Sequence, residues 1–460
     1  MDATANVAPI WFVNDKAWDD VRRQIGEIAG RFADASGFKP KPGRIQLLPD
    51  ANGALAGVLF GEASADDPEY DPLGAGKLAT SLPAGDYCFA NSPENPKLAT
   101  LGFLLGLYRY DRFKTESAPQ PRLLPPANVD FASLERQARA IAFGRDLINA
   151  PANVMTPAAL DEEAARLAEV SGAEYESIVG EALITRNFPL VHAVGAAAAE
   201  PPRLADFIWG RREAPKVTLV GKGVVFDTGG LDIKPSSAMD LMKKDMGGAA
   251  TALTLARMVI EAGLDVRLRV IVPIVENSIS ASAMRPSDVV VSRKGLSVEI
   301  GNTDAEGRLI LADALTFAAE EAPEILIDFA TLTGAARVAL GPDLPPFYTD
   351  DDALAADIQR CSAEVADPLW RMPLWRPYES YLESKIADLT NAPGSPFAGS
   401  LTAALFLRRF VGGAKAWVHF DLYAWNPKPR AHGPQGGEIQ AARALLAVLK
   451  ARYRTGGRSI

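Results

Sequence analysis

The sequence contains few cysteines and few histidines. Its two cysteines, Cys88 and Cys361, stand far apart in a chain of 460 residues, which excludes a disulfide framework and a paired-cysteine zinc site. Two isolated cysteines are typical of reduced core residues in a cytosolic protein. The three histidines do not form a His-Glu-x-x-His motif, so the usual zinc-protease site is also absent.

The sequence also lacks an excess of positive charge and any long apolar run. It has 48 Lys and Arg residues against 57 Asp and Glu residues, a net charge of −9, so no global basic field attracts nucleic acid or an anionic membrane. No segment approaches the ~20 apolar residues of a membrane span. Residues 1–20 have no basic region of the kind that opens a signal peptide. We therefore expect a soluble, cytoplasmic protein with no membrane partner, for which nucleic acid is an unfavourable ligand.

Signature motifs of two other enzyme classes are missing as well. There is no Gly-x-Ser-x-Gly elbow of a serine hydrolase. The segment Gly221-Lys222-Gly223 fails the P-loop pattern, because position 216 is Lys instead of Gly and a glycine follows the lysine. An isolated histidine in a strand, such as His419, is typical of a core residue.

What the chain does contain is an ordinary globular composition, with 48% hydrophobic and 23% charged residues. Its length, about three times the ~150 residues of one domain, predicts two domains. Residues 115–130 include four prolines and favour an extended linker over a helix. We therefore expect a small N-terminal α/β domain at residues 1–125, serving assembly or regulation, with strands at 44–48, 55–60 and 87–90 and a helix at 18–32.

Residues 126–460 show strands that alternate with helices. The expected strands are 217–220, 268–275, 325–329 and 417–422, and the expected helices are 247–262, 308–319, 401–410 and 439–453. This alternation predicts a larger α/β catalytic domain with a mixed central sheet flanked by helices. In such sheets the reactive groups gather where strands end and loops begin.

Two glycine-rich stretches carry the residues with catalytic potential. Residues 220–250 and 301–309 contribute Lys222, Asp227, Lys234, Asp245, Asp304, Glu306 and Arg308. Four carboxylates that converge would repel one another unless positive charge lies between them. Two divalent cations would balance the four charges, and carboxylate oxygens suit Mn or Zn. The pattern thus indicates a dinuclear metal site.

The order of these residues resembles the leucyl aminopeptidase (cytosol aminopeptidase) family. The resemblance rests on Lys222-x4-Asp227-x6-Lys234-x10-Asp245 and on the octapeptide Asn302-Thr303-Asp304-Ala305-Glu306-Gly307-Arg308-Leu309. Residues 149–153 and 331–334 support it. It covers roughly residues 140–440, whereas the N-terminal domain resembles the family only in size and position.

The resemblance implies a metal-dependent aminopeptidase that hydrolyses the N-terminal peptide bond of peptides with a free α-amine. It assigns one metal to Lys222, Asp227, Asp245 and Glu306, and the other to Asp227, Asp304 and Glu306. It makes Lys234 a cationic group that faces the substrate carbonyl, and Arg308 the holder of a bicarbonate that acts as general base. It places Met242, Thr331, Leu332 and Gly334 at the substrate, and it implies a homohexamer.

The chain departs from the family pattern at one strand end. Residues 417–426 replace the usual His-Leu-Asp-Ile-Ala-Gly-like sequence, and the bulky Tyr423 and Trp425 stand where small residues are common. This change leaves the metal residues intact but alters the expected shape of the substrate pocket. Leucine is therefore not assumed to be the preferred N-terminal side chain.

Three other functions fit parts of the pattern. A two-metal phosphatase or nuclease would also use carboxylates with Lys and Arg, but such sites usually recruit histidines and neither glycine-rich stretch has one. A DNA-binding accessory role is disfavoured by the net charge of −9. A catalytically inactive scaffold is disfavoured because every metal and catalytic position is filled.

Overall fold

The computed structural model describes residues 7–115 and 119–453. The chain divides into two compact units, one formed by residues 1–142 with 428–435 and the other by residues 143–427 with 436–460. Helix α5 (Phe131–Asn149) carries the chain from the first unit into the second. Among the described residues, no helix is both long enough and apolar enough to cross a membrane.

The first unit is built on a five-stranded sheet with the order β2-β3-β1-β4-β5, in which only β2 and β3 are antiparallel. The strands are β1 (Ala8–Val13), β2 (Ile45–Pro49), β3 (Leu55–Gly61), β4 (Gly85–Phe89) and β5 (Pro121–Leu123). The helices are α1 (Trp18–Gln24), α2 (Glu27–Ala35), α3 (Gly76–Ser81) and α4 (Pro96–Gly106). The expected small α/β domain is thus confirmed.

Two details of this unit differ from the sequence expectations. The helix expected at 18–32 is two helices, because Gly26 adopts a φ of 84° between α1 and α2. The described part of the proline-rich segment, residues 119–130, forms no helix, but it is not only a linker, because β5 pairs with β4 at the edge of the sheet. An edge strand tolerates proline because it needs fewer backbone donors.

The second unit is built on a nine-stranded mixed sheet. Its order is β15-β14-β17-β13-β8-β10-β7-β6, and β9 also pairs with β10. Strands β17, β13, β8 and β10 are parallel, whereas β14 and β7 run antiparallel to their inner neighbours. The strands are β6 (Glu174–Val179), β7 (Arg203–Trp209), β8 (Lys216–Gly221), β9 (Gly223–Asp227), β10 (Arg267–Asn277), β13 (Ile325–Ala330), β14 (Pro346–Tyr348), β15 (Trp370–Arg371) and β17 (Trp417–Asp421).

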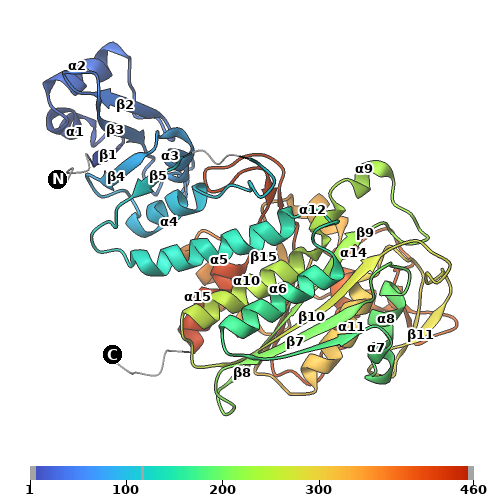
Figure 1. Ribbon diagram of the computed structural model, residues 1–460. Coiled ribbons are helices and arrows are strands. Elements are labelled where there is room, and N and C mark those ends of the chain that lie inside the picture. The colour runs from blue at the N-terminus through green and yellow to red at the C-terminus, as the bar shows by residue number, and fades with distance from the viewer. Residues whose placement is uncertain (1–6, 116–118, 454–460) are drawn as a thin grey trace. The chain divides into compact units, whose positions relative to one another are not determined.

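Helices cover both faces of this sheet (Figure 1). Helices α6 (Pro157–Val170), α10 (Gly247–Glu261) and α15 (Ala442–Arg452) form one layer, with α10 against β8 and β13. Helices α8 (Pro189–Gly195), α11 (Gly307–Ala319) and α14 (Gly399–Arg408) form the other layer, with α11 against β8 and β10. Smaller elements are α7 (Ala182–Thr185), α9 (Ser236–Met239), η1 (Met242–Met246), α12 (Gly334–Leu340), α13 (Asp352–Glu364), η2 (Arg376–Leu382), β11 (Val289–Val291), β12 (Ser297–Glu299), β16 (Leu389–Thr390), β18 (Trp425–Asn426) and β19 (Gly436–Gly437).

The parallel strands bring the ends of three chain segments together. Register pairs Gly221 with Phe329 and Ala330 with Asp421, so β8, β13 and β17 end side by side. Lys222 follows β8 and Thr331 follows β13 at this edge. The carboxyl edge of the central strands is therefore where the predicted site residues meet, as parallel α/β sheets require.

Candidate metal centre

Lys222 lies at the centre of the site. Its side chain is 3% exposed, and its Nζ lies 2.8 Å from Oδ2 of Asp245 and 3.0 Å from Oε1 of Glu306. It also donates a hydrogen bond to the carbonyl oxygen of Thr331 at 3.1 Å. Burial alone would lower the pKa of Lys222, but the carboxylates of Asp245 and Glu306 raise this pKa above its usual value. The lysine therefore supplies positive charge to the carboxylates around it.

Three buried carboxylates surround this point. Asp227, Asp245 and Glu306 each offer an oxygen, and these oxygens lie within 4.8 Å of one another. They come from the end of β9, from η1 and from the loop before α11. Burial, together with the charge of Asp227, raises the pKa of Glu306 to about 8. Close packing of buried acids in this way is unfavourable unless cations compensate them.

Two carboxylate oxygens of the cluster could act as metal ligands. Oδ2 of Asp245 and Oε1 of Glu306 face Lys222 at ion-pair distance but receive no hydrogen bond of acceptable geometry from the described residues. The two oxygens share one ammonium, and buried carboxylates need further compensation than that. Oxygen ligands with one amine nitrogen, which the metal would have to deprotonate first, form a set that suits a divalent cation, so the residues fit a metal.

A fourth carboxylate, Asp304, lies beside the three and is linked to them by Lys234. The Nζ of Lys234 lies 2.8 Å from Oδ2 of Asp227 and also pairs with Asp304. Burial and the charge of Asp227 raise the pKa of Asp304 to about 6. Burial alone would lower the pKa of Lys234, but the two carboxylates raise this pKa above its usual value. The two carboxylates therefore favour the charged form of Lys234.

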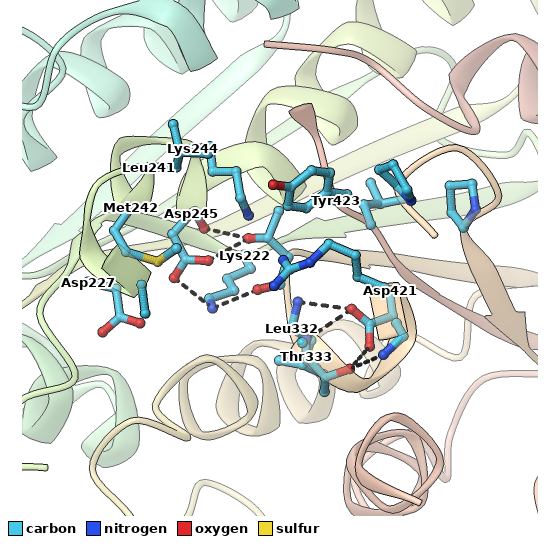
Figure 2. Close-up of a pocket in the computed structure, with 18 of the residues that line it drawn as sticks. Lys222, Asp227, Leu241, Met242, Lys244, Asp245, Leu332, Thr333, Asp421 and Tyr423 are labelled. Atoms are coloured by element: carbon cyan, nitrogen blue, oxygen red, sulfur yellow. Dashed lines mark hydrogen bonds and ion pairs between the residues drawn. The ribbon is translucent and has the colours of Figure 1, made fainter. Parts of the chain in front are cut away.

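The cluster lies in a cavity of about 360 Å³ (Figure 2). All predicted site residues except Arg308 line it: Lys222, Asp227, Lys234, Met242, Asp245, Asp304, Glu306, Thr331, Leu332 and Gly334. Thr331 also orients a carboxylate, because its Oγ1 donates to Oδ1 of Asp245 at 2.8 Å. The structure thus brings the metal and substrate residues proposed from the sequence into one site.

Arg308 occupies a different position. Helix α11 begins at Gly307, so Arg308 is in its first turn, whereas Asp304 lies in the preceding turn and Glu306 is the N-cap residue. Its Nη1 donates to the carbonyl oxygen of Asn391 at 2.7 Å, and its buried Nε has no partner among the described residues. Burial lowers the pKa of Arg308 to about 10. The guanidinium therefore keeps one N–H available for an anion.

Glycines bring the backbone close to the central lysine. A Cβ on Gly307 would lie 2.7 Å from the Nζ of Lys222, so the end of the lysine side chain would have to shift. Gly230 has a φ of 66°, and a Cβ there would contact Asn277 and Thr303 at 3.0 Å. Asn277 in turn donates to Oδ1 of Asp227 at 2.8 Å. The glycines of both stretches thus leave the space that the lysine and the carboxylates occupy.

Comparison with known proteins decides between the enzyme classes left open by the sequence. The family described as "Cytosol aminopeptidase family, catalytic domain" matches residues 142–446. The chain belongs to the cytosol aminopeptidase family. A second match, "M17 aminopeptidase, N-terminal domain", covers residues 9–126. The protein is therefore a metal-dependent aminopeptidase that releases the N-terminal residue from peptides.

Similar proteins support this assignment along nearly the whole chain. A probable cytosol aminopeptidase of Syntrophotalea carbinolica is 42% identical over 76% of this chain and 73% of its own length. The solved cytosol aminopeptidase of Coxiella burnetii is 43% identical with a TM-score of 0.92, covering 98% of this chain and 99% of that one. The bottromycin maturation enzyme BotP, solved in complex with Mn, is 31% identical with a TM-score of 0.87, covering 98% of this chain and 100% of that one.

Three residues of this aminopeptidase site were not singled out from the sequence. Asn277 holds Asp227, and Asn391 donates through Nδ2 to the carbonyl oxygens of Asn302 and Ala305. Asp421 is buried at the end of β17 and accepts the backbone N–H groups of residues 332 and 333, both at 3.1 Å. Only Asp421 left a signal in the sequence, as an acid at a strand end.

We expect Asp421→Asn to lower kcat/KM by about 10²-fold, because small displacements of substrate-contacting groups have effects of that size. Both oxygens of Asp421 accept hydrogen bonds, with Oδ2 bound by Thr333 Oγ1 at 2.6 Å and Ser400 Oγ at 2.8 Å. An amide replaces one acceptor by a donor and displaces the loop that carries Leu332. Steady-state kinetics and thermal unfolding measured together check this result.

Asp367→Asn provides the matched control. Asp367 is also buried and accepts backbone N–H groups from Ala441, Arg443 and Ala444, but it does not line the cavity. Both variants should lose about 1–3 kcal/mol of unfolding free energy. Equal losses of activity in the two variants would show that Asp421 has no positioning role.

Proposed function

We propose that this aminopeptidase binds two divalent metal ions, Mn or Zn, per subunit. Lys222, Asp227, Asp245 and Glu306 would hold one ion, and Asp227, Asp304 and Glu306 the other. The observation that carries this proposal is the convergence of three buried carboxylates within 4.8 Å beside a fourth. The Mn complex of the similar enzyme BotP supports it.

The bound ions would supply Lewis acidity at the scissile peptide bond. Lys234, held between Asp227 and Asp304, would donate a hydrogen bond to the carbonyl oxygen as negative charge develops on it. Arg308 would hold a bicarbonate through its free Nε, and the bound anion would supply the general base of the reaction. Met242, Thr331, Leu332 and Gly334 would contact the substrate.

The test is metal analysis combined with an activity screen over aminoacyl-amide substrates. We expect two equivalents of divalent metal per chain in active enzyme, and loss of activity with loss of metal. One equivalent in fully active protein would contradict the dinuclear site. The screen also identifies the preferred N-terminal side chain without assuming leucine.

We predict that turnover requires a free α-amine. The amine would lie beside Asp245, where an acetyl group would remove its basicity and add bulk. An unblocked dipeptide and its N-acetyl form are compared under identical metal loading. Equal rates for the two substrates would exclude an exopeptidase.

We also propose that the enzyme is a cytoplasmic homohexamer, with residues 1–125 as an N-terminal domain serving assembly or regulation and residues 126–460 as the catalytic domain. Large apolar side chains exposed on the single chain support an assembly, among them Trp370, Trp375, Val338 and Phe397. Light scattering on the purified protein gives the mass that tests it. The net charge of −9 supports the absence of a nucleic-acid partner.

A further inference from the structure

The cavity has a second pair of cations, separate from Lys222 and Lys234. Lys244 and Arg337 both line it and both approach the ring of Tyr423. The Nζ of Lys244 lies 4.9 Å from the ring centroid, and Cζ of Arg337 lies 4.7 Å from it. Figure 2 shows the Lys244 amine facing the Tyr423 ring, next to Asp245. The bulky residue at the altered strand end is thus flanked by positive charge.

These two cations differ from the other lysines of the cavity in their partners. Lys222 and Lys234 each pair with two carboxylates. Within residues 7–115 and 119–453, the side chains of Lys244 and Arg337 make no ion pair and no hydrogen bond. Lys244 is nevertheless only 5% exposed. A buried ammonium without a counter-ion is costly, and one aromatic face compensates only part of that cost.

The remaining acid near this pair is already used by the fold. Asp421 lines the same cavity, but its two oxygens accept the hydrogen bonds that fix residues 332 and 333 and the hydroxyl of Ser400. It therefore does not neutralise Lys244 or Arg337 at hydrogen-bond distance. The positive charge of this wall of the cavity is left for a ligand.

We propose that Lys244 and Arg337 form a subsite for a carboxylate of the substrate. An ammonium and a planar guanidinium that line one cavity and approach the same ring are suited to a carboxylate, which accepts charge-assisted hydrogen bonds from both. The subsite rests on the proposed function, because Lys244 directly precedes the metal-ligand candidate Asp245. The carboxylate comes either from an acidic N-terminal side chain or from the free C-terminus of a dipeptide.

Two substrate pairs distinguish these sources. Glutamyl-alanine amide against glutaminyl-alanine amide tests the side-chain carboxylate, and leucyl-alanine against leucyl-alanine amide tests the C-terminal one. In the Mn-loaded enzyme we expect kcat/KM to favour the charged member of one pair. Lys244→Met and Arg337→Gln should each lower that ratio by about tenfold, the effect of one hydrogen bond to a charged group. Because each ratio is taken within one variant, a general loss of turnover cancels.

Arg212→Gln is the matched control, since Arg212 is exposed, lies in a surface loop and does not line the cavity. It removes one positive charge and should leave both ratios unchanged. Arg337 is itself exposed, so its variant tests the subsite even where Lys244→Met fails to fold. Unchanged ratios for both pairs in Arg337→Gln and in folded Lys244→Met would overturn the subsite.

A binding measurement separates the subsite from the proposed function. Calorimetry gives dissociation constants for two ligand pairs. The first pair is glutamate and glutamine. The second pair, measured on the inactive Glu306→Gln protein, is leucyl-alanine and its amide. We expect the charged ligand of one pair to bind about tenfold more tightly, and Arg337→Gln to abolish that preference. Preferential binding without hydrolysis of any substrate would contradict the proposed function alone. Hydrolysis of the neutral substrates without any charge preference in rate or binding would contradict the subsite alone.

Discussion

Glu306→Gln should reduce turnover below detection while leaving the fold intact. The side chain of Glu306 is 1% exposed and lies among Lys222, Asp227 and Asp245, so its carboxylate is shared by both proposed metal positions. An amide keeps the shape but removes the charge and one metal-binding oxygen. Asp304→Asn should have the same effect on turnover, because it removes a ligand of the second position. Bound metal, circular dichroism and kcat are measured on the same samples.

Glu320→Gln is the control for this change. Glu320 follows the same helix, α11, but pairs with Arg293 and does not line the cavity. It should keep full metal content and full activity. Normal activity with full metal occupancy in Glu306→Gln or Asp304→Asn would remove that residue from the metal centre.

Lys234→Ala should retain both metal ions and lower kcat by about 10²–10³-fold, the usual loss for one oxyanion donor. Lys222→Ala should instead weaken the binding of one of the two ions. The difference follows from position, since Lys222 is buried between Asp245 and Glu306, whereas Lys234 bridges Asp227 to the more exposed Asp304. Metal stoichiometry and kcat, determined in parallel for the two variants, distinguish the roles.

Lys234→Arg serves as the conservative comparison. It keeps the charge but changes the shape and reach of the donor, so we expect only partial recovery of kcat relative to Lys234→Ala. If Lys234→Ala lost metal and Lys222→Ala did not, the roles of the two lysines would be reversed.

The elements of the catalytic domain were predictable where the hydrophobic pattern was strong. Buried parallel strands such as β8 and β13 read as short apolar runs, and α10 as a long apolar stretch after two glycines, so their limits agree within about two residues. Helix α5 and the antiparallel strand β7 were not predicted, because their hydrophobic patterns are weaker. The structure of such segments is decided by their packing against the sheet.

The candidate site was predictable to the extent that its residues lie in contiguous motifs. Asp304, Glu306 and their neighbours stand together in the sequence, so their types and spacing indicate a metal site. The sequence does not indicate a site at Lys244 and Arg337, which lie far apart in the chain. Only the folded structure brings both of them to the ring of Tyr423. The position of Arg308 depended on where α11 begins, and that helix begins at Gly307, one residue before the predicted start.

The wide separation of the site residues along the chain has a consequence for folding kinetics. Lys222 bonds to a residue 109 positions later, and Leu332 to one 89 positions later, so the site forms only after β8, β13 and β17 have paired. Contacts of such high sequence separation carry a large loop-closure entropy and form late. We therefore expect that metal does not act as a template for the early chain. During refolding, metal uptake should lag behind the recovery of helical signal, and adding metal should slow unfolding without accelerating folding.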